Sequence, residues 1–232
     1  MPTSHPLQLD AVVGLVVTAK ARSVLDVGTG FGKYGILARE YLDPANFAQQ
    51  EARGVRIDGI EVFEPYVTPV HRFVYDHLYI GDAVPILRTL DSTYDLVLLV
   101  DVIEHLERAE GIELLRACAR VGRNVLVSTP KDIGKQGAEF GNPAEVHRTQ
   151  WGRGDFRAIG SCFFVSNPLS IICVLGRDAA EIRSRWQSRG RRLKGVVAQN
   201  RLRRIVNAIP FLRRPYQRFE RPIERALKGS KP

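Results

Sequence analysis

The sequence predicts an α/β domain in which parallel strands alternate with crossover helices. Apolar runs of strand length alternate with helical patterns through about the first 180 of its 232 residues. The most apolar run, YDLVLLV at 94–100, is typical of a central strand buried on both faces. Hydrophobic residues make up 44% of the chain, which is enough for a full core. No apolar run approaches the roughly 18–20 residues of a membrane span.

Hydrophobic periodicity predicts the individual elements. An N-terminal helix is expected from the helical spacing of Leu9, Val12, Val13, Val16 and Val17. The predicted strands are 23–28, 56–62, 78–82, 94–100, 123–129, 161–166 and 169–175. The predicted helices are 32–41, 64–77, 83–90 and 106–121, with Pro65 suited to a first turn.

Two connections in the second half of the chain differ in kind. A Gly-rich and polar connection fills residues 130–150, and loops of this length in a compact domain are usually functional. The last two predicted strands, in contrast, are joined only through Asn167 and Pro168. Such a short link forces those two strands to be antiparallel.

Charge is unevenly distributed along the chain. Residues 1–180 carry 18 Lys and Arg against 22 Asp and Glu, whereas residues 181–232 carry 16 against 3. We therefore predict a domain at 1–180 and a basic helical tail at 181–232. The tail has an apolar stripe interleaved with arginines, formed by Ala198, Leu202, Ile205, Val206 and Ile209. The stripe suits an anionic membrane surface, its arginines and aromatic residues suit RNA as an alternative partner, and a solvated tail is the third possibility.

Cysteine usage and the N-terminus indicate the cellular compartment. The three cysteines, Cys118, Cys162 and Cys173, form no C-x-x-C pair and fit reduced thiols. The first residues lack the pattern of a secretory signal. The sequence thus predicts a cytoplasmic protein, peripheral at the membrane where the tail binds lipid.

Acidic residues stand at the ends of four successive predicted strands. The segment VLDVGTGFGKYG at 24–35 leads from a strand that ends at Asp26, through a glycine-rich turn, into a helix. Glu61, Asp82 and Asp101 end the next three strands. The carboxyl ends of parallel strands form the ligand-binding edge of an open sheet. Four acids at one edge suit a cationic or hydroxyl-rich ligand, which would offset their mutual repulsion.

The glycine-rich turn itself is a weak signal. Gly28, Gly30 and Gly32 permit positive φ and close approach of the backbone to a ligand. A dinucleotide fingerprint would need glycine where Lys33 stands, so binding of a pyrophosphate is not favoured.

Several segments together resemble the class I S-adenosylmethionine-dependent methyltransferases. They are LDVGTGFGKYG at 25–35, DGIEV at 58–62, IGDA at 80–83, YDLVLLVDVIEHL at 94–106 and NVLVSTP at 124–130. The resemblance covers residues from about 5 to 176. It implies a doubly wound, Rossmann-like, seven-stranded and mostly parallel sheet with an antiparallel last strand. It also implies S-adenosylmethionine as cofactor and methyl transfer as activity.

The resemblance assigns roles to the strand-end residues. Asp26, Gly28 and Gly30 would hold the methionine end of the cofactor. Glu61 would hold the ribose, and Asp82 with Ala83 would hold the adenine. Asp101 would lie beside the sulfonium and the acceptor. A sulfonium cation and two ribose hydroxyls are ligands that suit an acidic edge.

A second group of residues is a candidate metal site. Asp101, Glu104 and His105 lie at i, i+3 and i+4, and His147 follows on the long connection. Carboxylates with imidazoles can bind a divalent metal, and Glu104, His105 and His147 are the predicted ligands. The pattern resembles the acid-x-x-Glu-His plus distal His of small-RNA 2′-O-methyltransferases, and the similar segment of ubiquinone-type O-methyltransferases. Here the first acid is Asp rather than Glu, and the alternative is that His105 caps or packs a helix start.

The segment GNPAEVHRTQWGRGDF at 141–156 contributes the remaining candidates. His147 is a candidate general base. Trp151 and Phe156 are expected either to form a lid that stacks on a substrate ring or to belong to the core.

The motifs favour O-methylation of a small molecule or of a glycan or lipid-linked acceptor. Neither an Asn-Pro-Pro-Tyr nor an Asp-Pro-Pro-Tyr signature follows the fourth strand, and no Pro-Cys pair is present. These absences disfavour methylation of DNA bases. The alternatives are an RNA 2′-O-methyltransferase that uses the basic tail, or a cofactor-binding partner subunit without chemistry.

Overall fold

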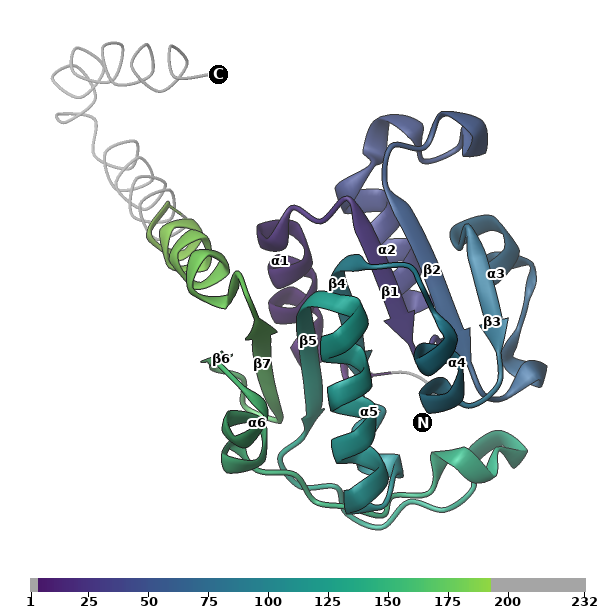
Figure 1. Cartoon of the computed structure of the whole chain (residues 1–232), viewed down its shortest axis with the longest axis vertical. Coiled ribbons are helices and arrows are strands. Elements are labelled where there is room, and N and C mark those ends of the chain that lie inside the picture. Colours follow the sequence, from purple (N-terminus) through teal and green to yellow (C-terminus); the bar gives the residue numbers. More distant parts are fainter. Residues whose placement is uncertain (1–3, 193–232) are drawn as a thin grey trace, which may run out of the picture. The chain divides into compact units, whose positions relative to one another are not determined.

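The computed structural model describes residues 4–192 (Figure 1). Within this range seven strands form one sheet in the order β3-β2-β1-β4-β5-β7-β6. The strands are β1 (Ser23–Val27), β2 (Arg56–Glu61), β3 (His77–Ile80), β4 (Tyr94–Val100), β5 (Gly122–Pro130), β6 (Cys162–Val165) and β7 (Ser170–Gly176). Strands β1 to β5 pair in parallel, whereas β7 pairs antiparallel with both β5 and β6. The predicted mostly parallel sheet with an antiparallel last strand is confirmed.

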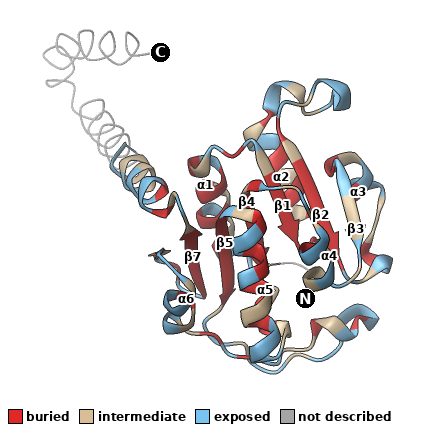
Figure 2. Ribbon diagram, viewed as in Figure 1, coloured by how far each residue is buried: buried red, intermediate tan, exposed pale blue. Residues whose placement is uncertain are grey.

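Helices cover both faces of the sheet (Figure 1). They are α1 (Leu9–Ala19), α2 (Lys33–Leu42), α3 (Pro69–Val74), α4 (Ala83–Thr89), α5 (Arg108–Val121) and α6 (Arg153–Ile159). In β4, Leu96 and Leu98 join the core cluster that contains α1 and α2, while Val97 and Leu99 join the cluster that contains α5. Because side chains alternate across a strand, an unbroken apolar strand serves both cores. Figure 2 shows the central strands as fully buried.

The prediction of one helix at 64–77 is wrong in its middle. A single 3-10 turn covers Glu64–Tyr66, and α3 starts only at Pro69. A residue before proline avoids the helical region, so the chain is extended at Thr68. The Thr68 N–H then donates to Nδ1 of His71 at 3.2 Å and caps α3.

Helix α6 was not predicted, because its sequence RGDFRAI follows a glycine-rich stretch and has little periodicity. Its first turn is capped by Asp155, whose Oδ2 accepts from the Gly152 N–H at 2.8 Å. The rings of Trp151 and Phe156 are 2% and 0% exposed and belong to the core around α5. The expectation of a lid formed by these two rings is therefore wrong, and the core alternative holds.

A further helix begins at residue 179 and continues to the end of the described range at 192. Ala179 and Ile182 are buried in the same core cluster as α1, and Trp186 packs against it. The compact unit of the domain extends to Trp186, so the predicted division at 180/181 falls inside this helix. The apolar stripe predicted at 198–209 lies outside the described residues. No helix within residues 4–192 has the length and apolar character that a membrane span needs.

Candidate active site

A cavity of about 410 Å³ opens at the carboxyl ends of the parallel strands. Its lining includes Gly28 and Gly30 after β1, Glu61 at the end of β2, Asp82 after β3 and Asp101 after β4. The volume is in the range of small-molecule sites. The structure thus brings together the strand-end residues that the sequence placed at one edge, with Asp26 as the exception.

The turn after β1 needs glycine for conformation and for space. Gly28, Gly30 and Gly32 have φ of +77°, +55° and +82°, which side chains rarely adopt. A Cβ on Gly28 would lie 2.4 Å from Cγ2 of Val102. The N–H of Gly28 donates to the carbonyl of Ile60 at 2.9 Å, which ties the turn to β2. The turn therefore presents bare backbone to the cavity.

Glu61 is 3% exposed and is held by the same turn. Its Oε2 accepts from the Gly30 N–H at 2.8 Å and from the Thr29 hydroxyl at 3.1 Å, and its Oε1 accepts from the Phe63 N–H at 3.0 Å. Burial raises the pKa of Glu61, and these hydrogen bonds oppose that shift. Since a carboxylate oxygen has two acceptor sites, Oε1 can still accept from a ligand hydroxyl.

Asp26 does not line the cavity, although the sequence placed it there. Its carboxylate is 2% exposed and accepts from the Tyr75 hydroxyl at 2.6 Å. Burial raises the pKa of Asp26 to about 7, and the Tyr75 hydrogen bond opposes this shift. Asp26 shares its face of β1 with Val24, and this face belongs to the core cluster that also contains Tyr75.

Asp82 and Ala83 line the cavity at the start of α4. Asp82 is exposed and caps this helix, since its Oδ1 accepts from the Val84 N–H at 3.0 Å. The second oxygen of the carboxylate is available to an amino group in the cavity.

Asp101 lies at the other end of the cavity in a strained conformation. Its φ is +53°, and its N–H donates to the Ser128 carbonyl at 2.8 Å. Oδ2 accepts from Nε2 of Gln8 at 2.5 Å. Oδ1 is buried and has no hydrogen-bond partner among the described residues. Burial raises the pKa of Asp101, while hydrogen bonds from the side chains of Ser4 and Gln8 and the positive charge of Lys33 oppose the shift. A cation in the cavity would therefore find an incompletely paired carboxylate.

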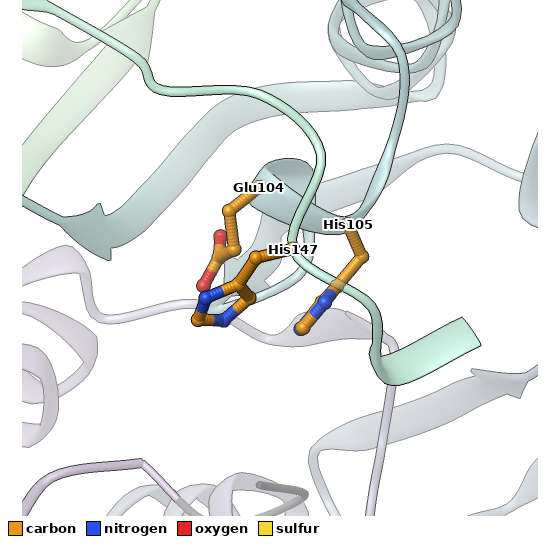
Figure 3. Close-up of side chains that lie close together, drawn as sticks. All are labelled: Glu104, His105 and His147. Atoms are coloured by element: carbon orange, nitrogen blue, oxygen red, sulfur yellow. The ribbon is translucent and has the colours of Figure 1, made fainter. Parts of the chain in front are cut away.

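Glu104, His105 and His147 come together beside the cavity, as predicted (Figure 3). One ligand atom from each residue lies within 4.8 Å of the others. Glu104 and His105 belong to a 3-10 turn at Ile103–His105, and His147 comes from the connection after β5. His105 lines the cavity itself. Asp101 is not part of the cluster, so the metal group has three members rather than four.

The hydrogen bonds around this cluster fit a metal site. Nδ1 of His105 lies 3.3 Å from the Val146 carbonyl, and Nδ1 of His147 contacts the Ile133 carbonyl. A carbonyl only accepts, so each Nδ1 carries the proton and each Nε2 keeps its lone pair, the arrangement of metal-binding histidines. Burial raises the pKa of Glu104 well above its usual range, with a further increase from Asp101, and burial lowers the pKa of His105. One carboxylate and two imidazoles suit a divalent transition metal.

Residues 139–145, which we call the strap, contribute Asn142, Ala144 and Glu145 to the cavity lining. The single proton of the Tyr66 hydroxyl is shared between Oε1 of Glu145 at 3.3 Å and the Glu139 carbonyl at 3.4 Å. Phe31 of the glycine turn packs edge-on against Tyr66 at 5.0 Å and against Phe140 at 6.1 Å between ring centroids. The strap is thus attached to the glycine-turn side of the cavity by aromatic contacts.

Sequence reasoning missed Gln8 and Tyr66, whereas the strap lies in the 130–150 connection that was predicted to be functional. Tyr66 stood within a segment that the sequence assigned to one helix. Gln8 has no motif around it, and only its place directly before an apolar helix distinguished it. Both residues act through contacts with distant segments, which no local pattern encodes.

Comparison with known proteins rests on structure alone. No family profile and no curated protein matches the sequence. The methyltransferase domain of a bacterial Hen1 protein superposes with a TM-score of 0.50 at 19% identity, covering 74% of this chain and 98% of that domain. An O-methyltransferase family protein from Burkholderia thailandensis gives a TM-score of 0.52 at 15% identity, covering 74% of this chain and 56% of the other.

A third neighbour was crystallised with a ligand. The magnesium protoporphyrin IX methyltransferase of Synechocystis, with bound S-adenosylhomocysteine, gives a TM-score of 0.50 at 18% identity, covering 73% of this chain and 82% of the other. At these identities the similarity concerns the fold. The strand order, the antiparallel β7 and the cavity at the strand ends agree with it. The chain has the fold of the class I S-adenosylmethionine-dependent methyltransferases.

Proposed function

We propose that the protein is an S-adenosylmethionine-dependent methyltransferase that methylates a hydroxyl group of a small molecule or of a glycan or lipid-linked acceptor. The observation that carries the proposal is the cavity between the glycine turn, Glu61 and Asp101. It offers bare backbone, a buried carboxylate and an incompletely paired carboxylate within one small-molecule site. These groups match the carboxylate and amino ends, the ribose hydroxyls and the sulfonium of that cofactor.

Each part of the cavity has a share in binding the cofactor. Gly28 and Gly30 hold the methionine end through backbone, and Glu61 accepts from the ribose hydroxyls. Asp82 and Ala83 hold the adenine. Asp101 lies beside the sulfonium. Asp26, which accepts from the Tyr75 hydroxyl, does not line the cavity.

The cofactor supplies a methyl group on a sulfonium, and transfer is an in-line displacement by the acceptor oxygen. The chain must align that oxygen, exclude water and take up the hydroxyl proton. His147 is the proposed general base, because its Nδ1 proton is fixed on the Ile133 carbonyl and its Nε2 is free to accept a proton. The strap limits access of water from the side of Tyr66.

As an alternative to the general base, a divalent metal is the proposed second cofactor, held by Glu104, His105 and His147, in which case Nε2 of His147 binds the ion and does not take up the proton. When bound, it lowers the pKa of a coordinated hydroxyl and so favours a hydroxyl acceptor. Glu104 must lose its proton to bind the ion, and burial of that carboxyl makes the loss pH-dependent.

The Glu104, His105 and His147 cluster also favours a second candidate function. Small-RNA 2′-O-methyltransferases have a similar acidic and histidine pattern, and a ribose 2′-hydroxyl is a suitable acceptor for this chemistry. The basic residues 181–232 would then bind RNA instead of an anionic membrane. Most of these residues lie outside the described range, and this partner remains a proposal.

Transfer of labelled methyl from the cofactor into a cell extract, fractionated into lipid, glycan, RNA and protein, tests both candidates. We expect label in the small-molecule, lipid or glycan fractions. Label confined to RNA would favour the second candidate. Cofactor binding without any transfer would favour the partner subunit.

The tail is tested by comparing the full chain with a chain truncated after Trp186, where the compact unit ends. Loss of sedimentation with anionic vesicles, at unchanged cofactor affinity, is the result expected for a membrane anchor. Binding of RNA with a steep salt dependence, and no binding of vesicles, would assign the tail to RNA.

A further inference from the structure

Gln8 is a buried polar residue that none of the motifs includes. It ends a 3-10 turn at Pro6–Gln8 and is 1% exposed. Its side-chain amide contacts three strands or strand ends that are far apart in sequence. The hydroxyls of Ser128 on β5 and Ser170 on β7 donate to its Oε1 at 2.8 and 2.7 Å. Its Nε2 donates to Oδ2 of Asp101 at 2.5 Å.

These partners fix the orientation of the amide. A carboxylate only accepts, so the donor nitrogen of Gln8 must face Asp101. The oxygen of Gln8 must then face the two serine hydroxyls, which are free to rotate and donate. The amide cannot flip without placing two acceptors against each other. The Asp101 carboxylate is therefore held through Oδ2 by a group that is itself held from two strands.

The choice of a neutral donor has a consequence for the charge in the cavity. Lysine or arginine at this position would pair with Asp101 and cancel its negative charge. An amide directs the carboxylate and stabilises its ionised form without cancelling the charge. The second oxygen, Oδ1, is left without a partner among residues 4–192. A cation that enters the cavity meets a carboxylate that is oriented and still charged.

Fastening of the N-terminal segment does not depend on Gln8. The Asn167 side chain donates to the Leu7 carbonyl at 3.0 Å, and Nζ of Lys33 donates to the Ser4 carbonyl at 3.2 Å. Two anchors thus hold the backbone on either side of the site, and Ser4 and Lys33 of the second anchor also interact with the Asp101 carboxylate. The contact from Gln8 to Asp101 is an addition to them.

We infer that Gln8 is a positioning residue that holds the Asp101 carboxylate toward the sulfonium of S-adenosylmethionine. The inference rests on the proposed function. It makes the N-terminal segment a part of the active site, and it gives Gln8 a role in distinguishing the cationic methyl donor from its neutral product, S-adenosylhomocysteine.

The test measures the affinities of both ligands by calorimetry for the full chain and for Gln8→Met. Gln8→Met keeps the length of the side chain and removes the amide. We expect the affinity for S-adenosylmethionine to fall about tenfold relative to that for S-adenosylhomocysteine, since a hydrogen bond to a charged group is lost. Gln8→Asn, which keeps an amide but is too short to reach Asp101, should show the same change and guards against loss of folding.

A double-mutant cycle separates positioning from a structural role. In an Asp101→Asn background, Gln8→Met should leave the ratio of the two affinities unchanged, because the charge it positions is gone. The matched control is Asn167→Ala, which loosens the same N-terminal segment. It should lower the affinities for the two ligands by the same factor or leave both unchanged. Thermal melting reports the stability of every variant.

Two results would overturn the inference alone. In the first, Gln8→Met lowers the affinities for S-adenosylmethionine and S-adenosylhomocysteine by the same factor. In the second, Gln8→Met changes the ratio of the two affinities as much in the Asp101→Asn background as in the wild-type background. A wild-type protein that binds neither ligand would overturn the proposed function and this inference together. A loss of affinity for S-adenosylmethionine alone, seen only when Asp101 is present, supports both the proposed function and the inference.

Discussion

The two sides of the cavity are built on different principles. On the side of β1 and β2, both oxygens of Glu61 already accept hydrogen bonds from the glycine turn and from Phe63. On the side of β4, Asp101 has an oxygen without a partner among the described residues, and the Nε2 atoms of His105 and His147 are not used by the carbonyls that fix their rings. On the first side both carboxylate oxygens are held by hydrogen bonds within the protein, whereas the second side keeps acceptor atoms that these hydrogen bonds do not use.

This difference indicates which side of the cavity the fold holds in place without a ligand. Hydrogen bonds from backbone N–H groups preorganise the Glu61 side at little cost when the cofactor binds. The β4 side keeps buried acids whose pKa values burial raises, which is a cost to stability that chemistry with a cation or metal would offset. Substitutions on the first side should therefore affect both folding and binding, while those on the second should affect binding and catalysis.

The largest effect on the cofactor is expected for Glu61→Ala. It removes the proposed acceptor for a ribose hydroxyl, and a charge-assisted hydrogen bond is worth about 1.5–3 kcal/mol. We expect the cofactor affinity, measured by calorimetry, to fall by about ten- to a hundredfold. The free energy of unfolding should also fall by roughly 1–3 kcal/mol, because the Gly30 and Phe63 N–H groups lose their acceptor.

The matched control for Glu61→Ala is Glu64→Ala, which removes an exposed carboxylate three residues away. Glu64→Ala should leave the cofactor affinity and the free energy of unfolding unchanged. Wild-type affinity in the Glu61→Ala protein would remove Glu61 from the cofactor site, and unchanged stability would contradict a preorganised first side.

Asp26→Asn tests the cost of burying the Asp26 carboxyl through the pH dependence of the free energy of unfolding. Burial raises the pKa of Asp26 from 3.8 to about 7, so the folded protein holds this proton over a range where the unfolded chain has released it. Asp26 therefore lowers the free energy of unfolding as pH rises from about 4 to about 7, by up to roughly 4 kcal/mol. Asp26→Asn should remove this contribution while the Tyr75 hydroxyl keeps an acceptor.

Urea denaturation at several pH values between about 4.5 and 7.5 measures this contribution as a difference in slope between the two proteins. Other carboxylates titrate equally in both proteins, so their contributions cancel in the difference between the two slopes. Parallel stability curves would mean that Asp26 is ionised at low cost, and the argument from its burial would fail.

The metal cluster is tested by Mn²⁺ binding, which needs no acceptor. His147→Ala should weaken Mn²⁺ binding about 10–100-fold at unchanged affinity for S-adenosylhomocysteine. Wild-type affinity for Mn²⁺ should rise with pH, because burial raises the pKa of Glu104 and its proton must leave. His77→Ala, at an exposed position on β3, is the control. Equal Mn²⁺ binding by all three proteins would assign the cluster to packing.

The sequence predicted the sheet well because the strands are short apolar runs whose periodicity is local. All seven strands lie within two residues of their predicted bounds. The predicted helix at 64–77 breaks at Pro69, because proline keeps Thr68 extended. Helix α6 was not predicted because its periodicity is weak and its buried ring, Phe156, packs in a core built from distant segments. Local patterns predict elements, whereas caps and core contacts from distant segments decide where those elements break.

The same distinction applies to the site. Glu61, Asp82 and Asp101 were predictable, since any residue at the carboxyl end of a parallel strand reaches the same edge. The sequence also placed Asp26 there, and only the side-chain alternation within β1 directs it to Tyr75 instead. Gln8 and Tyr66 could not be predicted, because each is defined by partners from distant parts of the chain.

The smallest effect is expected for Tyr66→Phe, which tests how the strap joins the two sides. The variant loses two long hydrogen bonds, of 3.3 and 3.4 Å, and keeps the ring contacts with Phe31 and Phe63. We expect the free energy of unfolding to change by less than about 1 kcal/mol and cofactor affinity by less than about threefold. Hydrogen exchange should accelerate in residues 139–145 alone, because these bonds oppose local opening of the strap. Tyr41→Phe, at an exposed position on α2, should leave exchange unchanged everywhere. Faster exchange in the glycine turn as well would mean that the strap stabilises the first side, and the two sides would then be one unit.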